Sequence, residues 1–207
     1  MEGRRLLRLG AVAAVLGGCA IAGYNVVEYV FFSGAPMSSL ANLPGWLAFQ
    51  IVGLLGTLFV VLGLCGLYAA QAQHAGVLGL VGFTLALVGV LQYYGLTFMA
   101  AFLLPSVGRA APMLLDGPDP LLGAGLIGTV LISTLGWILF AVATLRTRVF
   151  PRWTGVLLLV AAIVPFVTMP VGIALPVGPV ALGIALIGMG YSMLTGRADP
   201  RLLLAPA

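Results

Sequence analysis

The sequence is short of charge. Only 7% of its 207 residues are Asp, Glu, Lys or Arg, against roughly a quarter in an ordinary soluble domain. Lysine is absent, and all nine basic residues are arginines. The hydrophobic fraction is 62% and the mean hydropathy is +1.20. These values exclude a soluble globular domain and predict an integral membrane protein.

Metal-binding and catalytic residue types are scarce as well. His74 is the single histidine, which excludes a haem held by two histidines of one chain. The two cysteines, Cys19 and Cys65, are expected at different depths in the membrane and are not expected to form a disulfide. No nucleotide loop, nucleophile motif or metal-ligand spacing is present, and no basic run is interleaved with aromatic residues. We therefore expect no metal, no cofactor and no nucleic-acid partner, and catalysis is not favoured.

Long apolar runs are what the sequence has in abundance. A helix needs about 20 apolar residues to cross the hydrocarbon core. Because lipid offers no partners to backbone groups, and the alternation of a membrane barrel is missing, each run is predicted to be helical. Six runs approach or exceed this length: 6–32, 46–70, 77–104, 121–145, 153–170 and 177–194. The prediction is one all-α domain over residues 1–207 with six transmembrane helices.

The positions of the arginines predict the orientation. Eight of them fall in three segments that share one side of a six-span chain, and only Arg109 falls on the other side. The eight are Arg4, Arg5, Arg8, Arg146, Arg148, Arg152, Arg197 and Arg201. The positive-inside rule therefore predicts that both termini are cytoplasmic. It also accounts for the net charge of +4 without a nucleic-acid partner.

Twenty-nine glycines predict close helix packing, because helices in lipid associate through backbone approach and small side chains. Small residues recur at helical spacing in the first three spans. The three ridges are Gly10, Ala14, Gly18 and Ala22; Gly53, Gly56 and Gly63; and Gly79, Gly82, Ala86 and Gly89. These ridges are expected to meet one another, which makes the first three helices the predicted core.

Polar side chains share these ridges and a common depth. Asn25, Glu28, Gln50, Tyr93 and Thr97 are predicted to point inward in the outer half of the membrane, and Tyr24 lies at a similar depth. The pattern predicts a polar, aromatic-lined pocket between the first three helices, open or nearly open to the outside.

Glu28 is the residue that most needs an explanation, since an unpaired carboxylate within a span is costly. One interpretation is structural: Glu28 lies at the outer interface, bonds to Asn25 or a tyrosine hydroxyl and fixes helix packing. The other is functional: Glu28 accepts a proton or binds a cation on a solute pathway. Arg109, in the following outer loop, is its candidate counter-ion.

Span four carries further polar residues, for which the interpretation is structural. The hydroxyls of Ser133 and Thr134 are expected to bond to their own helix backbone, and Trp137 is expected to pack between helices.

Four segments, "LYAAQAQHAGVLGLVGFTLALVG", "APMLLDGPDPLLGAG", "LGWILFAVATLR" and "VFPRWTGVLLLV", carry a resemblance to known sequences. The chain resembles a group of small, uncharacterised polytopic membrane proteins found in actinobacteria and other bacteria with GC-rich genomes. The resemblance covers about the middle two-thirds of the chain, and "VFPRW" is its most distinctive part. It implies a location in the bacterial cytoplasmic (inner) membrane. It implies no activity and no catalytic residues.

Three classes of function are compatible with the sequence. The favoured one is a non-catalytic accessory protein, or a binder of lipid or another apolar ligand, with a polar pocket in the outer leaflet. The alternative is a small proton- or cation-coupled transporter or channel that uses Glu28. An intramembrane enzyme acting on a lipid is a less favoured third. The expected partners are membrane lipids, with a protein partner or a second copy of the chain left open.

Overall fold

The computed structural model describes residues 2–34, 36–40, 42–116, 120–168 and 176–196, and this part of the chain folds into helices without strands. The helices are α1 (Glu2–Phe32), α2 (Met37–Leu40), α3 (Trp46–Phe102), α4 (Leu104–Ala110), α5 (Met113–Asp116), α6 (Pro120–Thr147), α7 (Arg152–Thr168) and α8 (Val177–Leu194). By length and composition, α1, α3, α6 and α8 each hold a segment able to cross a membrane, and α7 is a shorter apolar helix. The predicted all-helical class is confirmed.

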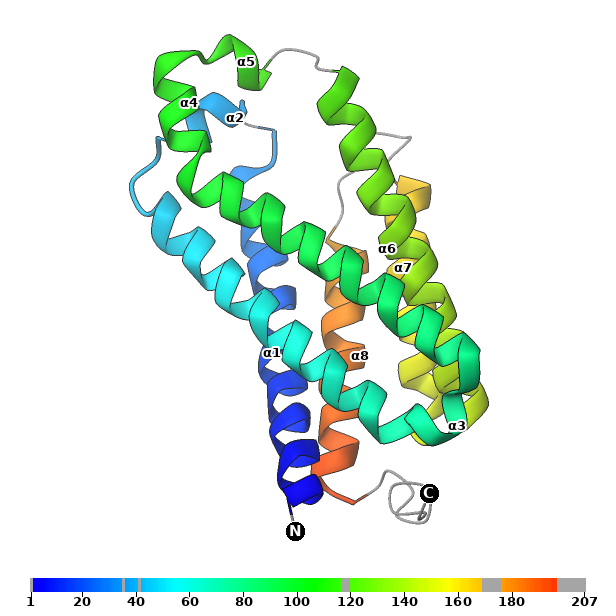
Figure 1. The fold of residues 1–207 in the computed structure, drawn as a ribbon. Coiled ribbons are helices and arrows are strands. Elements are labelled where there is room, and N and C mark those ends of the chain that lie inside the picture. The colour runs from blue at the N-terminus through cyan, green and yellow to red at the C-terminus, as the bar shows by residue number, and fades with distance from the viewer. Residues whose placement is uncertain (1, 35, 41, 117–119, 169–175, 197–207) are drawn as a thin grey trace.

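Helix α3 consists of two arms, 46–75 and 77–102, joined by a sharp turn at Gly76. This residue has φ 56° and ψ −160°, a backbone conformation that glycine adopts freely and other residues avoid. The sequence predicted two spans here with a turn over 71–76. The structure keeps the first arm helical up to the turn and reverses the chain at one residue (Figure 1).

The two arms of α3 lie side by side along their length. Near the turn, the rings of Tyr68 and Phe83 stack with their centroids 4.3 Å apart. At the far ends, Trp46 Nε1 donates a 2.8 Å hydrogen bond to the carbonyl of Ala100. α3 is therefore a helical hairpin held at both ends.

The long helices form a ring around the centre of the molecule. α1 packs between the first arm of α3 and α8, α8 packs against α7, and α7 against α6. α6 packs against the second arm of α3, and the hairpin closes the ring. The same order of neighbours is visible in Figure 1.

Helix α1 contacts both of its neighbours nearly backbone to backbone. A Cβ atom added to Gly10 would lie 2.6 Å from the Cα of Gly66 on the first arm of α3. One added to Gly18 would lie 2.5 Å from the carbonyl oxygen of Gly183 on α8. The small-residue ridge predicted for this helix is thus a packing surface, as small residues in membrane helices generally are.

The small-residue ridge on the second arm of α3 packs against α6 rather than against α1. A Cβ atom added to Gly82 would lie 2.5 Å from the backbone nitrogen of Phe140, and Gly136 meets the backbone of Ala86. The prediction that the first three helices form the core by themselves is therefore wrong. Periodicity identifies the face that packs closely, but it does not identify the helix on the other side.

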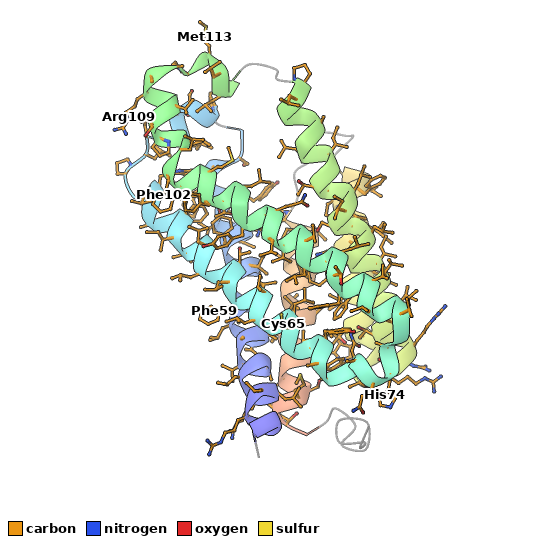
Figure 2. All side chains as sticks on the ribbon, viewed as in Figure 1. Phe59, Cys65, His74, Phe102, Arg109 and Met113 are labelled. Atoms are coloured by element: carbon orange, nitrogen blue, oxygen red, sulfur yellow. The ribbon has the colours of Figure 1, made fainter. Side chains whose placement is uncertain are left out.

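The two ends of the ring are built differently. One end carries the short helices α2, α4 and α5, and we call it the capped end; Arg109 and Met113 lie there (Figures 1 and 2). The other end, which we call the turn end, holds the N-terminus, the Gly76 turn with His74, and the connection between α6 and α7 (Figures 1 and 2).

Candidate functional site

Tyr24 and Gln50 join α1 to the first arm of α3. The hydroxyl of Tyr24 donates a hydrogen bond to Gln50 Oε1, and the two residues are only 6% and 1% exposed. The ring of Tyr24 also stacks on Phe49, with centroids 4.3 Å apart. The polar atoms of this pair are satisfied within an aromatic environment.

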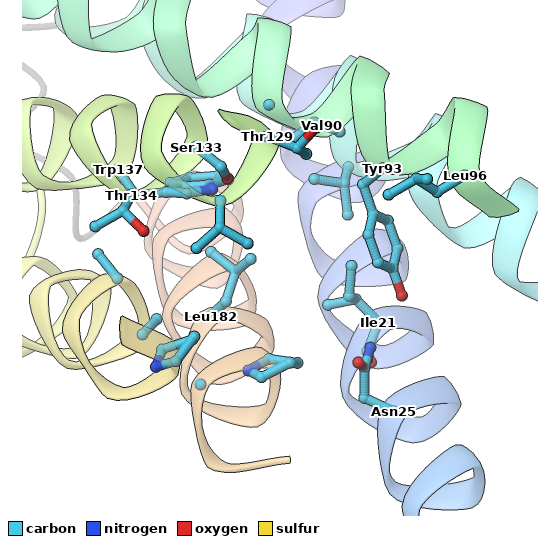
Figure 3. A pocket seen from close by; sticks show the side chains of 18 of the residues that line it. Ile21, Asn25, Val90, Tyr93, Leu96, Thr129, Ser133, Thr134, Trp137 and Leu182 are labelled. Carbon is cyan, nitrogen blue, oxygen red and sulfur yellow. The ribbon is translucent and has the colours of Figure 1, made fainter. Parts of the chain in front are cut away.

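Asn25 and Tyr93 join α1 to the second arm of α3. Their side chains lie close together, and the hydroxyl of Tyr93 points toward the Asn25 amide (Figure 3). Asn25 Nδ2 donates to the carbonyl of Ile21 at 2.8 Å. Thr97, which is buried, donates to the Tyr93 carbonyl at 3.0 Å. The predicted polar residues of three helical segments therefore do meet.

Glu28 lies one turn beyond Tyr24 on α1 and is half-buried. Its carboxylate lies near the hydroxyls of Tyr24 and Tyr93. We call Tyr24, Asn25, Glu28, Gln50 and Tyr93 the Glu28 cluster. The cluster combines one carboxylate with neutral hydrogen-bonding groups.

Arg109 does not join the Glu28 cluster. It lies on α4, its side chain is exposed, and its Nε donates to the carbonyl of Pro105 on its own helix at 2.9 Å. Within the part of the chain that the structure describes, no ion pair links it to Glu28. The geometry gives no support to the predicted role of Arg109 as a counter-ion.

A cavity of about 410 Å³ lies at the centre of the ring. Its wall comes from α1, both arms of α3, α6, α7 and α8, and several of its side chains are shown in Figure 3. Most of the wall is apolar, including Ile21, Val90, Leu126, Val130 and Leu182. The volume lies within the roughly 300–1,000 Å³ of small-molecule binding sites.

Two members of the Glu28 cluster, Asn25 and Tyr93, line the cavity. The other predicted site residues, Tyr24, Glu28, Gln50, Thr97 and Arg109, are not part of its wall. The sequence predicted a pocket between the first three helices, whereas this cavity extends to α6, α7 and α8. The difference arises because the second arm of α3 packs on α6 and leaves the centre of the ring open.

The sequence did not predict that α6 contributes side chains to the wall of the pocket. Ser133, Thr134 and Trp137 line the cavity together on one side of this helix (Figure 3). Among the described residues, neither hydroxyl has a hydrogen-bond partner, so the prediction that both bond to their own helix backbone is wrong. Their spacing was a usable signal, because residues three and four apart share a helix face.

No group of three or more His, Cys, Asp or Glu side chains that could hold a metal ion occurs among the described residues. No family model, curated protein or solved structure matches this chain. The class is thus defined by the fold and the cavity alone: an all-helical protein with several helices of membrane-spanning length and apolarity, arranged around an internal cavity.

Proposed function

We propose that this protein holds an uncharged apolar ligand, a lipid or another long-chain molecule, in the cavity at the centre of its ring. The observation that carries the proposal is the cavity of about 410 Å³, whose wall is mostly apolar with a few polar groups. Binding sites for apolar molecules have this composition. Among the described residues, no acidic, basic or histidine side chain lines the cavity, which favours holding a ligand over acid–base catalysis.

The proposal includes six membrane spans. Each arm of α3 is longer than the roughly 20 residues that a span requires. α7 has 17 residues, which is the lower limit of the roughly 17–25 residues found in spanning helices. With α1, α6 and α8, these segments supply the six spans.

We further propose that both termini are cytoplasmic. The turn end of the ring carries Arg5 and Arg8 near the N-terminus, and Arg146, Arg148 and Arg152 around the connection between α6 and α7. Cytoplasmic segments are enriched in such residues. The Glu28 cluster then lies in the outer half of the membrane. Its Gln50 is one helical turn from Trp46, and the Trp46–Ala100 end of the hairpin lies opposite the turn.

The resemblance of the sequence supports a location in the inner membrane of a bacterium. Large apolar side chains such as Phe98, Phe102, Leu131 and Ile163 are about half exposed on the ring, and membrane lipids are the natural partners of such a surface.

The transport alternative rests on Glu28, which is half-buried and has no cationic partner in the described part of the chain. Transporters place several ionisable groups along a pathway. The described wall of this cavity holds no Asp, Glu, Lys, Arg or His side chain. Ligand retention is therefore the better-supported function.

Native mass spectrometry of the full-length protein, purified in mild detergent, tests the proposal. We expect the wild type to retain one long-chain molecule. Ala162→Phe places a large ring in the cavity wall and should abolish retention. Ile163→Phe is the matched control, because the neighbouring residue on α7 is 47% exposed on the outside of the ring.

The comparison of these two variants decides the outcome. Equal retention in Ala162→Phe and Ile163→Phe, or no retained molecule in any form, contradicts ligand binding in the cavity. Glu28→Gln should keep both the fold and the ligand. If it instead abolishes a proton- or cation-dependent flux in proteoliposomes while Ala162→Phe has no effect on retention, the transport alternative is favoured.

A further inference from the structure

Three hydrogen-bonding side chains on α6 face the cavity without a partner. They are the hydroxyls of Ser133 and Thr134 and the indole N–H of Trp137, and the described structure gives none of them a hydrogen bond. Trp137 is only 6% exposed. Figure 3 shows the three side chains close together on one wall.

Two other polar side chains of the cavity wall already have hydrogen-bond partners. Thr129 Oγ1 donates to the carbonyl of Gly125 at 3.0 Å. Asn25 Nδ2 donates to the carbonyl of Ile21 at 2.8 Å, and the hydroxyl of Tyr93 is directed toward the Asn25 amide (Figure 3). In the described part of the chain, α6 thus holds three unpartnered hydrogen-bonding groups of the cavity wall at one place.

Such groups are costly to leave unpaired. A polar group without a partner in apolar surroundings costs about 1–3 kcal/mol, and most of the cavity wall is apolar. A hydroxyl in a membrane helix usually avoids this cost by bonding to its own backbone, as Thr57, Thr97 and Thr144 do in this protein. Ser133 and Thr134 do not, so they remain available to a ligand.

We propose that these three side chains form a binding point for the carbonyl oxygen of an uncharged, long-chain ligand. The inference rests on the proposed function and specifies the ligand's polar group. The indole N–H only donates hydrogen bonds, and both hydroxyls are able to donate. Their common complement is an acceptor oxygen, which a ketone, ester or quinone carbonyl supplies.

The rest of the wall fits the remainder of such a ligand. The part of the wall that the structure describes carries no acidic, basic or histidine side chain, so a charged group would find no counter-ion on it. Away from α6, the surface is formed by apolar residues such as Ile21, Pro165, Pro179 and Leu182. A hydrocarbon chain is suited to contact this surface.

The test compares two probes on the delipidated full-length protein in detergent: a long-chain 2-ketone and the n-alkane with the same number of carbons. One hydrogen bond contributes about 0.5–1.5 kcal/mol net, so the wild type should bind the ketone about two- to tenfold more tightly. A fatty-acid methyl ester and a short-tail quinone then distinguish the two natural sources of such a carbonyl.

Variants of single residues on α6 test whether these side chains cause the preference for the ketone over the alkane. Ser133→Ala and Thr134→Val each remove a free hydroxyl, and Trp137→Phe removes the N–H; each should lower the preference for the ketone toward unity without weakening alkane binding. Thr129→Val is the control. Its hydroxyl lines the same cavity but already bonds to Gly125, so the preference should persist. The circular dichroism spectrum establishes that each variant is folded.

The outcomes distinguish a failure of this inference alone from a failure of the proposed function. Equal binding of ketone and alkane, with both abolished by Ala162→Phe, overturns the carbonyl binding point and leaves apolar binding intact. An equal loss of preference in Thr134→Val and Thr129→Val also overturns it. If neither probe binds, the proposed function fails together with the inference.

Discussion

Two glutamines on α3 are fully buried but differ in their hydrogen bonding. Gln50 accepts the hydroxyl of Tyr24. Gln71 accepts only a long 3.4 Å bond from Thr147, and its amide nitrogen has no partner. Thr147 has a second acceptor, the carbonyl of Thr144, at 3.1 Å. Removing the two amides should therefore have different consequences.

Gln50→Leu should lower the free energy of unfolding by about 1–3 kcal/mol, because the buried Tyr24 hydroxyl loses its acceptor. Gln71→Leu should change it by less than about 1 kcal/mol, because a buried nitrogen that is already unpaired is removed. Unfolding in mixed detergent and SDS, followed by circular dichroism, measures both. If Gln71→Leu lowers the free energy of unfolding as much as Gln50→Leu does, the hydrogen-bond partners described for the two glutamines are contradicted.

The polar residues that the sequence located were those lying on small-residue ridges. Asn25 and Tyr93 were predicted to point inward because they continue ridges of glycine and alanine, and in the structure both line the central cavity. Ser133 and Thr134 were not recognised, because the default for a hydroxyl in a helix is a local bond to the carbonyl one turn earlier. Whether that bond forms depends on the tertiary surroundings, which no single-sequence pattern supplies.

Helix α6 packs closely against the second arm of α3 at only one of its ends. Gly136 meets the backbone of Ala86, and a Cβ atom added to Gly89 would lie 2.6 Å from the Cβ of Ser133. Toward the capped end, a Cβ atom added to Gly125 would have no neighbour within 4 Å. The helices therefore separate toward the capped end, beside the cavity.

We predict opposite effects for the same substitution at the two positions on α6. Gly136→Ala forces the helices apart and should cost about 1–3 kcal/mol of unfolding free energy, as overpacking does. Gly125→Ala meets open space and should stabilise the protein by up to about 1 kcal/mol through helix propensity. The same detergent unfolding assay measures both. If both variants are equally destabilised, the separation of the two helices is not a feature of the folded protein.

At the scale of helices, the sequence predicted the elements well and their neighbours poorly. The run 177–194 matches α8 residue for residue, and 46–70 and 77–104 correspond to the two arms of α3. The spacing of small residues does not show which helix packs against each ridge, because Gly82 and Gly10 present equally small surfaces to any neighbour. The pairing of α6 with the second arm depends on the closure of the whole ring.

The cavity belongs to the molecule as a whole, since its wall draws on α1, α3, α6, α7 and α8. Six helical segments in a ring leave a central space that two or three packed helices would not. The apolar composition predicted the class of protein, and the ring supplies the site. This is why the sequence located one edge of the site, at Asn25 and Tyr93, and not its interior.

Fluorescence from Trp137 tests ligand binding in this cavity most directly, because Trp137 is the tryptophan that lines it. In a Trp46→Phe/Trp153→Phe background, Trp137 is the only emitter, and the probe is the methyl ester of a brominated fatty acid, whose bromine atoms quench on contact. We predict saturable quenching that Ala162→Phe abolishes and Ile163→Phe preserves. Fluorescence that stays unchanged, or that falls without saturation and equally in both variants, would contradict the account.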